Sequence, residues 1–192
     1  MSEQNTPTAS TVRIIVAFGC CMLGAMLPLD RAWAYNAITV DTGYGLEDTR
    51  LLRLNFSIGD NRRTPTGDGW HWNRFWEANL SYWYLYKSKK GEEKLLELGL
   101  TPNIRAERDQ AWNWGRPYLE AGLGVHLLSK VHIGTRNLSS SLQFGTHAGL
   151  GIRFGQSEQF ELGWRIEHLS NAGLHEPNPG INFSMMRFGY RW

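Results

Sequence analysis

The sequence predicts an all-β fold, a closed barrel of eight antiparallel strands, on three observations. After residue 35, apolar and polar residues alternate with period two in eight segments, and no helical period appears. Residues 1–34 have the pattern of a cleaved export signal and contain both cysteines. Aromatic residues, among them nine Trp in 192 residues, gather near strand ends, and the chain stops on an aromatic residue within a strand. Together these features are typical of a transmembrane β-barrel of the bacterial outer membrane.

The first 34 residues are predicted to be a signal peptide removed after Ala34. A polar stretch ending at Arg13 precedes an apolar run from Ile14 to Leu27, and Ala32-Trp33-Ala34 follows as a cleavage motif. The run is shorter than the roughly 20 residues of a membrane-spanning helix, so a buried helix, a single anchor or a lipoprotein cysteine is the weaker alternative. Residues 35–192 then form one barrel domain without cysteine, which excludes thiol catalysis and cysteine-ligated zinc.

Each of the eight segments carries apolar or aromatic residues at one set of positions. The other set carries Arg, Glu, Asn, His, Gln or Gly; in the first segment Ile38 and Val40 alternate with Thr39 and Asp41. The predicted strands cover residues 38–44, 52–58, 76–86, 96–101, 119–127, 142–154, 160–167 and 186–192. The longest connections are predicted at Asn61–Trp72, Glu107–Gly115, Lys130–Ser140 and Asn171–Gly180.

Alternation alone does not separate a soluble sandwich from a membrane barrel, because the two folds bury opposite faces. A sandwich buries its apolar face, whereas a small outer-membrane barrel turns that face toward lipid and encloses the polar one. Export without a retained cysteine and the terminal aromatics favour the barrel, as do strand-end aromatics at Trp70, Trp72, Phe75, Trp76, Trp112 and Trp114. The enclosed Arg and Glu residues are predicted to form an ionic network that leaves no pore.

A histidine and a serine stand on the face that the barrel turns toward lipid. His168 and Ser170 are two residues apart on one strand, so they share the face of Ile166. Polar groups on a lipid-facing surface are energetically unfavourable, so their presence indicates a function. A Ser beside a His is the smallest set of residues for nucleophilic hydrolysis. Asn182, with the same parity on the next strand, is predicted to orient the imidazole. The alternative is a polar strand end at the headgroup level. No metal site is predicted, because the other histidines lack ligand spacing.

The segment from His168 to Asn182 reads H-x-S-N-A-G-L-x-x-P-N-P-G-x-N, and residues 117–125 read PYLEAGLGV. Both resemble the lipid A 3-O-deacylase family of outer-membrane enzymes. The resemblance implies an eight-stranded barrel with the active site on its outer wall, which removes the ester-linked acyl chain at position 3 of lipid A without a cofactor. It implies Ser170 as the nucleophile, His168 as the general base, and Asn171 and Gly173 as the oxyanion hole.

One position departs from the family pattern, because Asn182 stands where the family has Glu. A neutral amide can orient the imidazole through its carbonyl oxygen, although it stabilises imidazolium less than a carboxylate does. The outer-membrane phospholipase A pattern also combines His-x-Ser with a later Asn, which supports Asn182 as the third member. Glu176 in the connecting loop is its rival, whereas Glu167 has the parity of the inner face.

The expected partners are lipid A or lipopolysaccharide as substrate, the surrounding outer-membrane lipids, and the barrel assembly machinery acting on Trp192. A net charge of +2 without a long basic block excludes a simple nucleic-acid patch, and a homodimer is left open. We expect outer cations to meet lipid A phosphates, with a solvated charge run as the alternative; they are Lys87, Lys89, Lys90, Lys130 and Arg136. The alternative functions are a phospholipase-type or palmitoyl-transfer enzyme and a non-catalytic structural or adhesive barrel.

Overall fold

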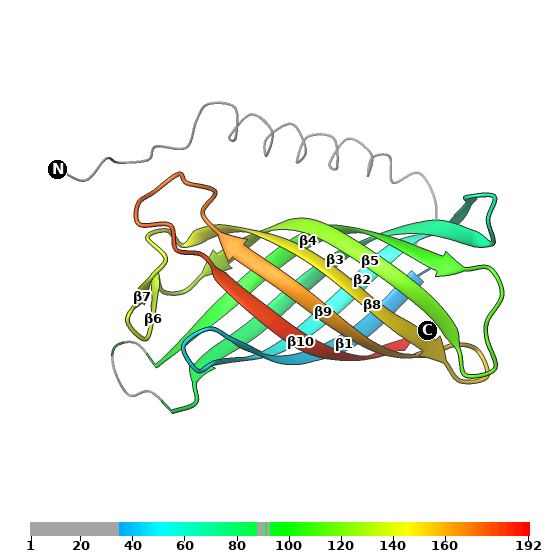
Figure 1. Cartoon of the computed structure of the whole chain (residues 1–192), viewed down its shortest axis with the longest axis horizontal. Coiled ribbons are helices and arrows are strands. Elements are labelled where there is room, and N and C mark those ends of the chain that lie inside the picture. The colour runs from blue at the N-terminus through cyan, green and yellow to red at the C-terminus, as the bar shows by residue number, and fades with distance from the viewer. Residues whose placement is uncertain (1–34, 88–90, 92) are drawn as a thin grey trace.

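The structure, a computed structural model, describes residues 35–87, 91 and 93–192, so the predicted signal peptide lies outside the described residues. Eight strands close into an antiparallel barrel in the order β1-β10-β9-β8-β5-β4-β3-β2 (Figure 1), as predicted. The described part of the chain contains no helix with the length and hydropathy of a membrane span. The barrel strands are β1 (Tyr35–Gly45), β2 (Thr49–Pro65), β3 (Trp70–Leu85), β4 (Lys94–Arg108), β5 (Arg116–Leu128), β8 (Leu142–Phe154), β9 (Phe160–Ser170) and β10 (Ile181–Arg191).

Two connections differ from the prediction. The long connection predicted at Asn61–Trp72 is wrong, because β2 runs on to Pro65 and β3 begins at Trp70. The pairing of β2 with β3 shifts register between Asp60 and Thr64, and this irregularity interrupts the alternation that revealed the other strands. Within the predicted Lys130–Ser140 connection, the short strands β6 (His132–Ile133) and β7 (Arg136–Asn137) form an additional hairpin.

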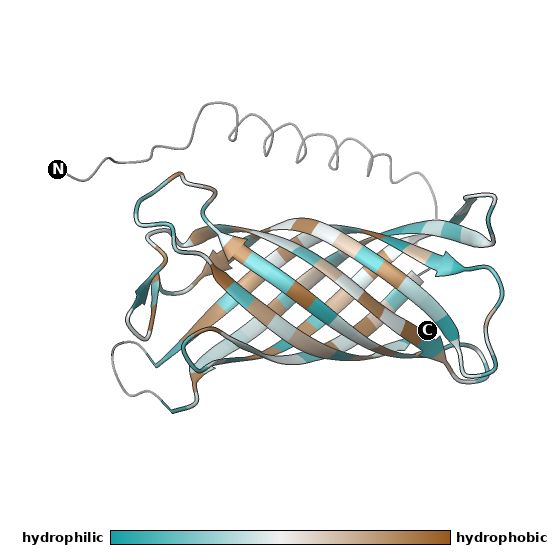
Figure 2. Cartoon of the chain, in the orientation of Figure 1, coloured by the Kyte–Doolittle hydropathy of each residue, from teal (hydrophilic) through white to brown (hydrophobic). Residues whose placement is uncertain are grey.

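The two faces of the barrel wall have the predicted polarity. Leu52 and Leu54 on the outer face are about half exposed, at 51% and 53%, whereas Arg53 between them is 1% exposed. Figure 2 shows the resulting alternation of hydrophobic and hydrophilic bands along each strand. Phe75 was predicted to be one of the aromatic residues at the membrane interface, and this is wrong. Its side chain points into the barrel, where the guanidinium carbon of Arg105 lies 5.0 Å from the centre of its ring. Its odd position on β3 gives it the inner face.

The middle of the barrel is filled by the predicted ionic network. Arg165 donates to Glu77 at 2.6 Å, and Glu120 accepts hydrogen bonds from both Arg105 and Arg165 at 2.7 Å. Buried charges are tolerated only when they are paired and hydrogen-bonded, and these groups meet that condition across strands that are distant in sequence. Further buried pairs join Arg53 to Glu97, Arg53 to Glu167, Arg105 to Glu161, Arg153 to Glu107, and Arg187 to Asp41.

The end of the barrel away from the free ends of β1 and β10, here called the distal end, is filled by apolar side chains. This set, the mouth cluster, combines inward-facing strand residues with Ile133 and Leu138 of the β6–β7 segment. Trp83 and Phe183 meet in it edge to face, with ring centres 4.7 Å apart. The hairpin therefore packs into the barrel like the core of a soluble domain. The other members are Leu51, Leu95, Leu128, Leu169, Ile181 and Met185.

Candidate active site

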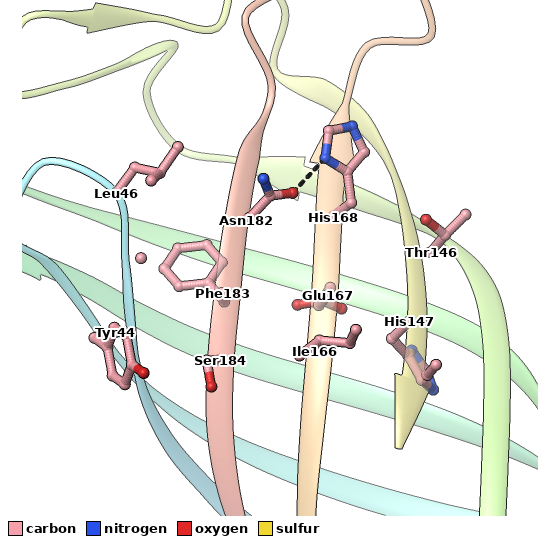
Figure 3. Close-up of a pocket in the computed structure, with 12 residues that line it drawn as sticks. Tyr44, Leu46, Thr146, His147, Ile166, Glu167, His168, Asn182, Phe183 and Ser184 are labelled. Carbon is pink, nitrogen blue, oxygen red and sulfur yellow. Dashed lines mark hydrogen bonds between the residues drawn. The ribbon is translucent and has the colours of Figure 1, made fainter.

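The histidine and the asparagine predicted to work together face each other across two neighbouring strands. The antiparallel register pairs His168 of β9 with Asn182 of β10. Their side chains meet on the outer wall, with His168 Nδ1 2.6 Å from Asn182 Oδ1 (Figure 3). Because an amide oxygen only accepts hydrogen bonds, this contact assigns the proton to Nδ1. The other ring nitrogen, Nε2, then has a free lone pair and can accept a proton.

Ser170 is the last residue of β9, two positions beyond His168 on the same face. It is half-buried, and it pairs in register with Phe144 of β8. Two residues along a strand span about 6.6 Å, a distance that an imidazole can bridge toward a serine hydroxyl. The described residues show no hydrogen bond from Ser170 to His168, and catalytic hydrogen bonds are commonly long before substrate binds.

The two glutamates weighed as alternatives lie elsewhere. Glu176 is exposed in the loop between β9 and β10, and the described contacts of His168 do not include it. Glu167 points into the barrel, where its carboxylate lies 2.7 Å from the Arg53 guanidinium. Of Asn182 and its predicted rival Glu176, the structure brings only Asn182 to the imidazole, and Glu167 faces inward as its parity predicted.

The loop after Ser170 is folded around the buried side chain of Asn171. Its Oδ1 accepts from the Gly173 N–H at 2.9 Å, and its Nδ2 donates to the carbonyl of His175 at 2.8 Å. The N–H of Asn171 itself donates to Asn178 Oδ1 at 3.1 Å. Both N–H groups predicted as the oxyanion hole therefore donate to side-chain amide oxygens in this state.

The mouth cluster anchors the site from inside the barrel. Leu169, which lies between His168 and Ser170, is 0% exposed, and Ile181, which precedes Asn182, is 1% exposed. Both side chains belong to the mouth cluster, so the two strand ends that carry the polar residues are fixed by apolar packing on the opposite face. Sequence reasoning missed this support. The sequence did contain a sign of the mouth cluster, because apolar residues such as Leu51 and Leu95 occupy inward-facing positions at the strand ends, where polar residues would be expected.

Arg136 of β7 forms hydrogen bonds with the loop before β10 and with the loop after β1. Its Nη1 donates to the carbonyl of Gly180 at 2.8 Å, and its Nη2 donates to Glu47 Oε1 at 2.7 Å. Gly180 has a φ of +56°, and a Cβ built on it would lie 2.7 Å from Cε1 of His168. This position therefore needs glycine both for its backbone conformation and for the space of the imidazole.

A groove on the outer wall begins beside His168 and crosses β1, β10, β9 and β8. Its volume is about 630 Å³, and its apolar walls include Tyr44, Leu46, Ala148 and Ile166. Ser184 also lines it and accepts a hydrogen bond of 2.9 Å from Trp164 Nε1 on the same outer face. A largely apolar groove with a few convergent polar groups at one end is the usual form of a site for an apolar ligand.

This chain is similar to known proteins over most of its length. Residues 49–191 match the family model described as "Lipid A 3-O-deacylase (PagL)". The lipid A deacylase PagL of Bordetella bronchiseptica is 31% identical over 155 residues, which cover 73% of this chain and 83% of the relative. The lipid A deacylase PagL of Pseudomonas aeruginosa is 32% identical over 168 residues, 81% of this chain and 92% of the relative.

The similarity extends to the three-dimensional structure. The crystal structure of the outer membrane enzyme PagL superposes with a TM-score of 0.70 at 27% identity, and the match covers 80% of this chain and 98% of that one. The matched family model extends over most of the described barrel, including the His168–Asn182 segment. This chain is an outer-membrane β-barrel that belongs to the lipid A 3-O-deacylase family.

Proposed function

We propose that this chain hydrolyses the ester-linked acyl chain at position 3 of lipid A, with Ser170 as the nucleophile and His168 as the general base. The observation that carries the assignment is the His168–Asn182 hydrogen bond on the outer wall. It leaves Nε2 able to accept a proton on a surface that otherwise faces hydrocarbon. Exposing an imidazole to hydrocarbon is energetically unfavourable, and general-base catalysis on a membrane lipid explains why a histidine stands at this position.

The chemical steps use the residues on the outer wall. Ser170 Oγ attacks the ester carbonyl while its proton passes to Nε2 of His168, and the tetrahedral intermediate forms. It collapses when the bond between the acyl carbon and the 3-oxygen of the sugar breaks, and the imidazolium gives its proton to that departing oxygen, which becomes the free 3-hydroxyl. Water then attacks the acyl-serine with His168 again as base, which releases the fatty acid and restores Ser170. Asn182 accepts from Nδ1 throughout and keeps the ring in the productive orientation.

We propose the N–H groups of Asn171 and Gly173 as the oxyanion donors. Both belong to a tight loop next to Ser170, in which Ala172 and Gly173 have φ angles of +55° and +76°. In this state they donate to the side chains of Asn178 and Asn171. An oxyanion at the reacting carbon would replace these neutral amide oxygens as the acceptor. This exchange stabilises the tetrahedral intermediate, because hydrogen bonds to a charged oxygen are roughly twice as strong as those to a neutral one.

The groove supports the choice of substrate. It starts beside the imidazole and offers apolar walls to a single chain, with Tyr44 and Ile166 along its length. An acyl chain that leaves the bilayer laterally can enter it without crossing water. We place the distal end at the outer leaflet, because lipid A resides in that leaflet. We propose that residues 1–34 are removed first and that the barrel assembly machinery acts on Trp192, which follows β10.

The test is mass spectrometry of purified lipid A incubated with refolded residues 35–192, beside the Ser170→Ala variant. The expected result is the loss of one 3-hydroxyacyl mass with the unmodified barrel and no loss with the variant. Both samples must first migrate as folded, heat-modifiable barrels on a gel. If lipid A stays intact while phospholipids release fatty acid, the phospholipase alternative replaces this proposal. If neither lipid is cleaved, the barrel is not an esterase.

A further inference from the structure

Two cations and two tyrosines form a patch at the distal end of the barrel, here called the rim patch: Tyr44 of β1 and Arg50 of β2 on the outer wall, with Tyr86 and Lys87 directly after β3. Arg50 of β2 pairs in register with Tyr44 of β1. Its guanidinium carbon lies 5.7 Å from the Tyr44 ring centre and 5.3 Å from that of Tyr86. The Lys87 ammonium lies 5.9 Å from the Tyr86 ring centre. The rings thus hold both cations in place by cation–π attraction.

The rim patch lacks an internal counter-ion within the part of the chain that the structure describes. Neither Arg50 nor Lys87 forms an ion pair with a described carboxylate, whereas Arg136, also at the distal end, is paired with Glu47 at 2.7 Å. A cation on the lipid-facing wall of a barrel is costly unless an anion or water reaches it. Within the described residues the rim patch is therefore a positive surface that is open to an external anion.

Tyr44 connects the rim patch to the groove. It lines the groove and also contacts Arg50, and in register it pairs with Ser184 of β10, two residues from Asn182. In Figure 3, Tyr44 forms the β1 side of the groove, and Asn182 and His168 stand between it and β8. Neighbouring strands are about 4.8 Å apart, so Arg50 lies three strands from His168. A headgroup whose acyl chain occupies the groove can span that width.

We propose that the rim patch binds a phosphate group of the same lipid whose acyl chain lies in the groove. This rests on the proposed function and names a part of the substrate that the groove alone does not recognise. A guanidinium presents paired N–H groups that match two phosphate oxygens, and a neighbouring ammonium supplies a second cation for a group of more than one negative charge. Of the cations that the sequence suggested for this task, Arg136 is occupied by Gly180 and Glu47, and Lys89 and Lys90 lie outside the described residues.

The experiment compares Arg50→Gln with a matched control, Lys94→Gln. Lys94 is exposed on the same face and at the same height, because Arg50 pairs with Tyr84 and Tyr84 pairs with Lys94. Binding is measured on proteins that also carry Ser170→Ala, so that turnover plays no part. The ligands are bisphosphorylated lipid A and the same lipid A after enzymatic dephosphorylation, each in phosphatidylcholine vesicles with and without phosphatidylglycerol.

We expect Arg50→Gln to raise the Kd for phosphorylated lipid A about tenfold, as the loss of one charge-assisted pair implies. It should leave the Kd for the dephosphorylated lipid unchanged, and Lys94→Gln should change neither. An equal loss for both ligands would overturn the proposal, because the side chain would then act on the fold. A loss that depends on phosphatidylglycerol and not on the substrate's phosphates would also overturn it, in favour of a neighbouring phospholipid. Because binding is read without turnover, these outcomes are independent of whether Ser170 catalyses hydrolysis.

Discussion

Replacing Asn182 by Ala tests how much of the activity depends on orienting the imidazole. The side chain makes one hydrogen bond of 2.6 Å, from His168 Nδ1 to its Oδ1. A neutral hydrogen bond contributes about 1 kcal/mol net, which corresponds to about a fivefold change in rate. Loss of the acceptor also lets the ring proton move to Nε2, where the nitrogen can no longer act as base. We therefore expect kcat to fall roughly five- to tenfold, with KM nearly unchanged.

Replacing Asn182 by Glu makes the complementary test. A carboxylate accepts a charge-assisted hydrogen bond about twice as strong as a neutral one, and it stabilises the imidazolium that forms during the reaction. We expect kcat to be preserved or raised. Met186→Leu is the matched control, since Met186 lies on the same strand and face and is 50% exposed. Initial rates of fatty acid release from lipid A measure all three variants. Full activity of the Ala variant would show that another residue, such as Glu176, orients His168. An inactive Glu variant would show that the acceptor at this position does not act by stabilising the imidazolium.

Two further predictions concern the support of the site. Gly180→Ala should lose most of its activity while keeping a folded barrel, because Gly180 has a φ of +56° and the new Cβ would lie 2.7 Å from His168 Cε1; an active Ala variant would show that the loop has room. Arg136→Met should lower kcat about fivefold, because it removes the hydrogen bond to the carbonyl of Gly180. Glu47→Gln keeps that hydrogen bond and should leave kcat near the unmodified value. Equal effects of the two variants would show that the bond to Gly180 is not what supports the site.

The sequence was sufficient to predict the barrel because strand polarity is a local signal. Arg53 between Leu52 and Leu54 tells which side is enclosed once the fold is a membrane barrel, and the structure confirms it with exposed leucines around a buried arginine. Parity also placed His168 and Asn182 on the same outer face. Their direct pairing follows from the β9–β10 register, which the sequence indicated only as neighbouring strands.

The features that the sequence did not reveal depend on contacts between distant segments. Inward apolar residues such as Leu51 and Leu169 look like exceptions to the alternation until the β6–β7 hairpin is seen to pack against them. The polar stretch after Gly59 hid the end of β2, because the register shift there removes the period-two pattern. Arg136 was predicted to meet lipid A phosphates, with a solvated cation as the alternative, and only the folded loops bring it to Gly180.

If His168 activates Ser170 on the outer wall, covalent labelling with a fluorophosphonate will depend on both residues. Such a probe reacts with an activated serine, and Ser184, which lines the groove beside His168, serves as the internal comparison. We expect one adduct, mapped to Ser170 by peptide mass spectrometry, which is absent in Ser170→Ala and forms at least about a hundredfold more slowly in His168→Ala. An adduct on Ser184, or labelling of Ser170 at the same rate without His168, would contradict it.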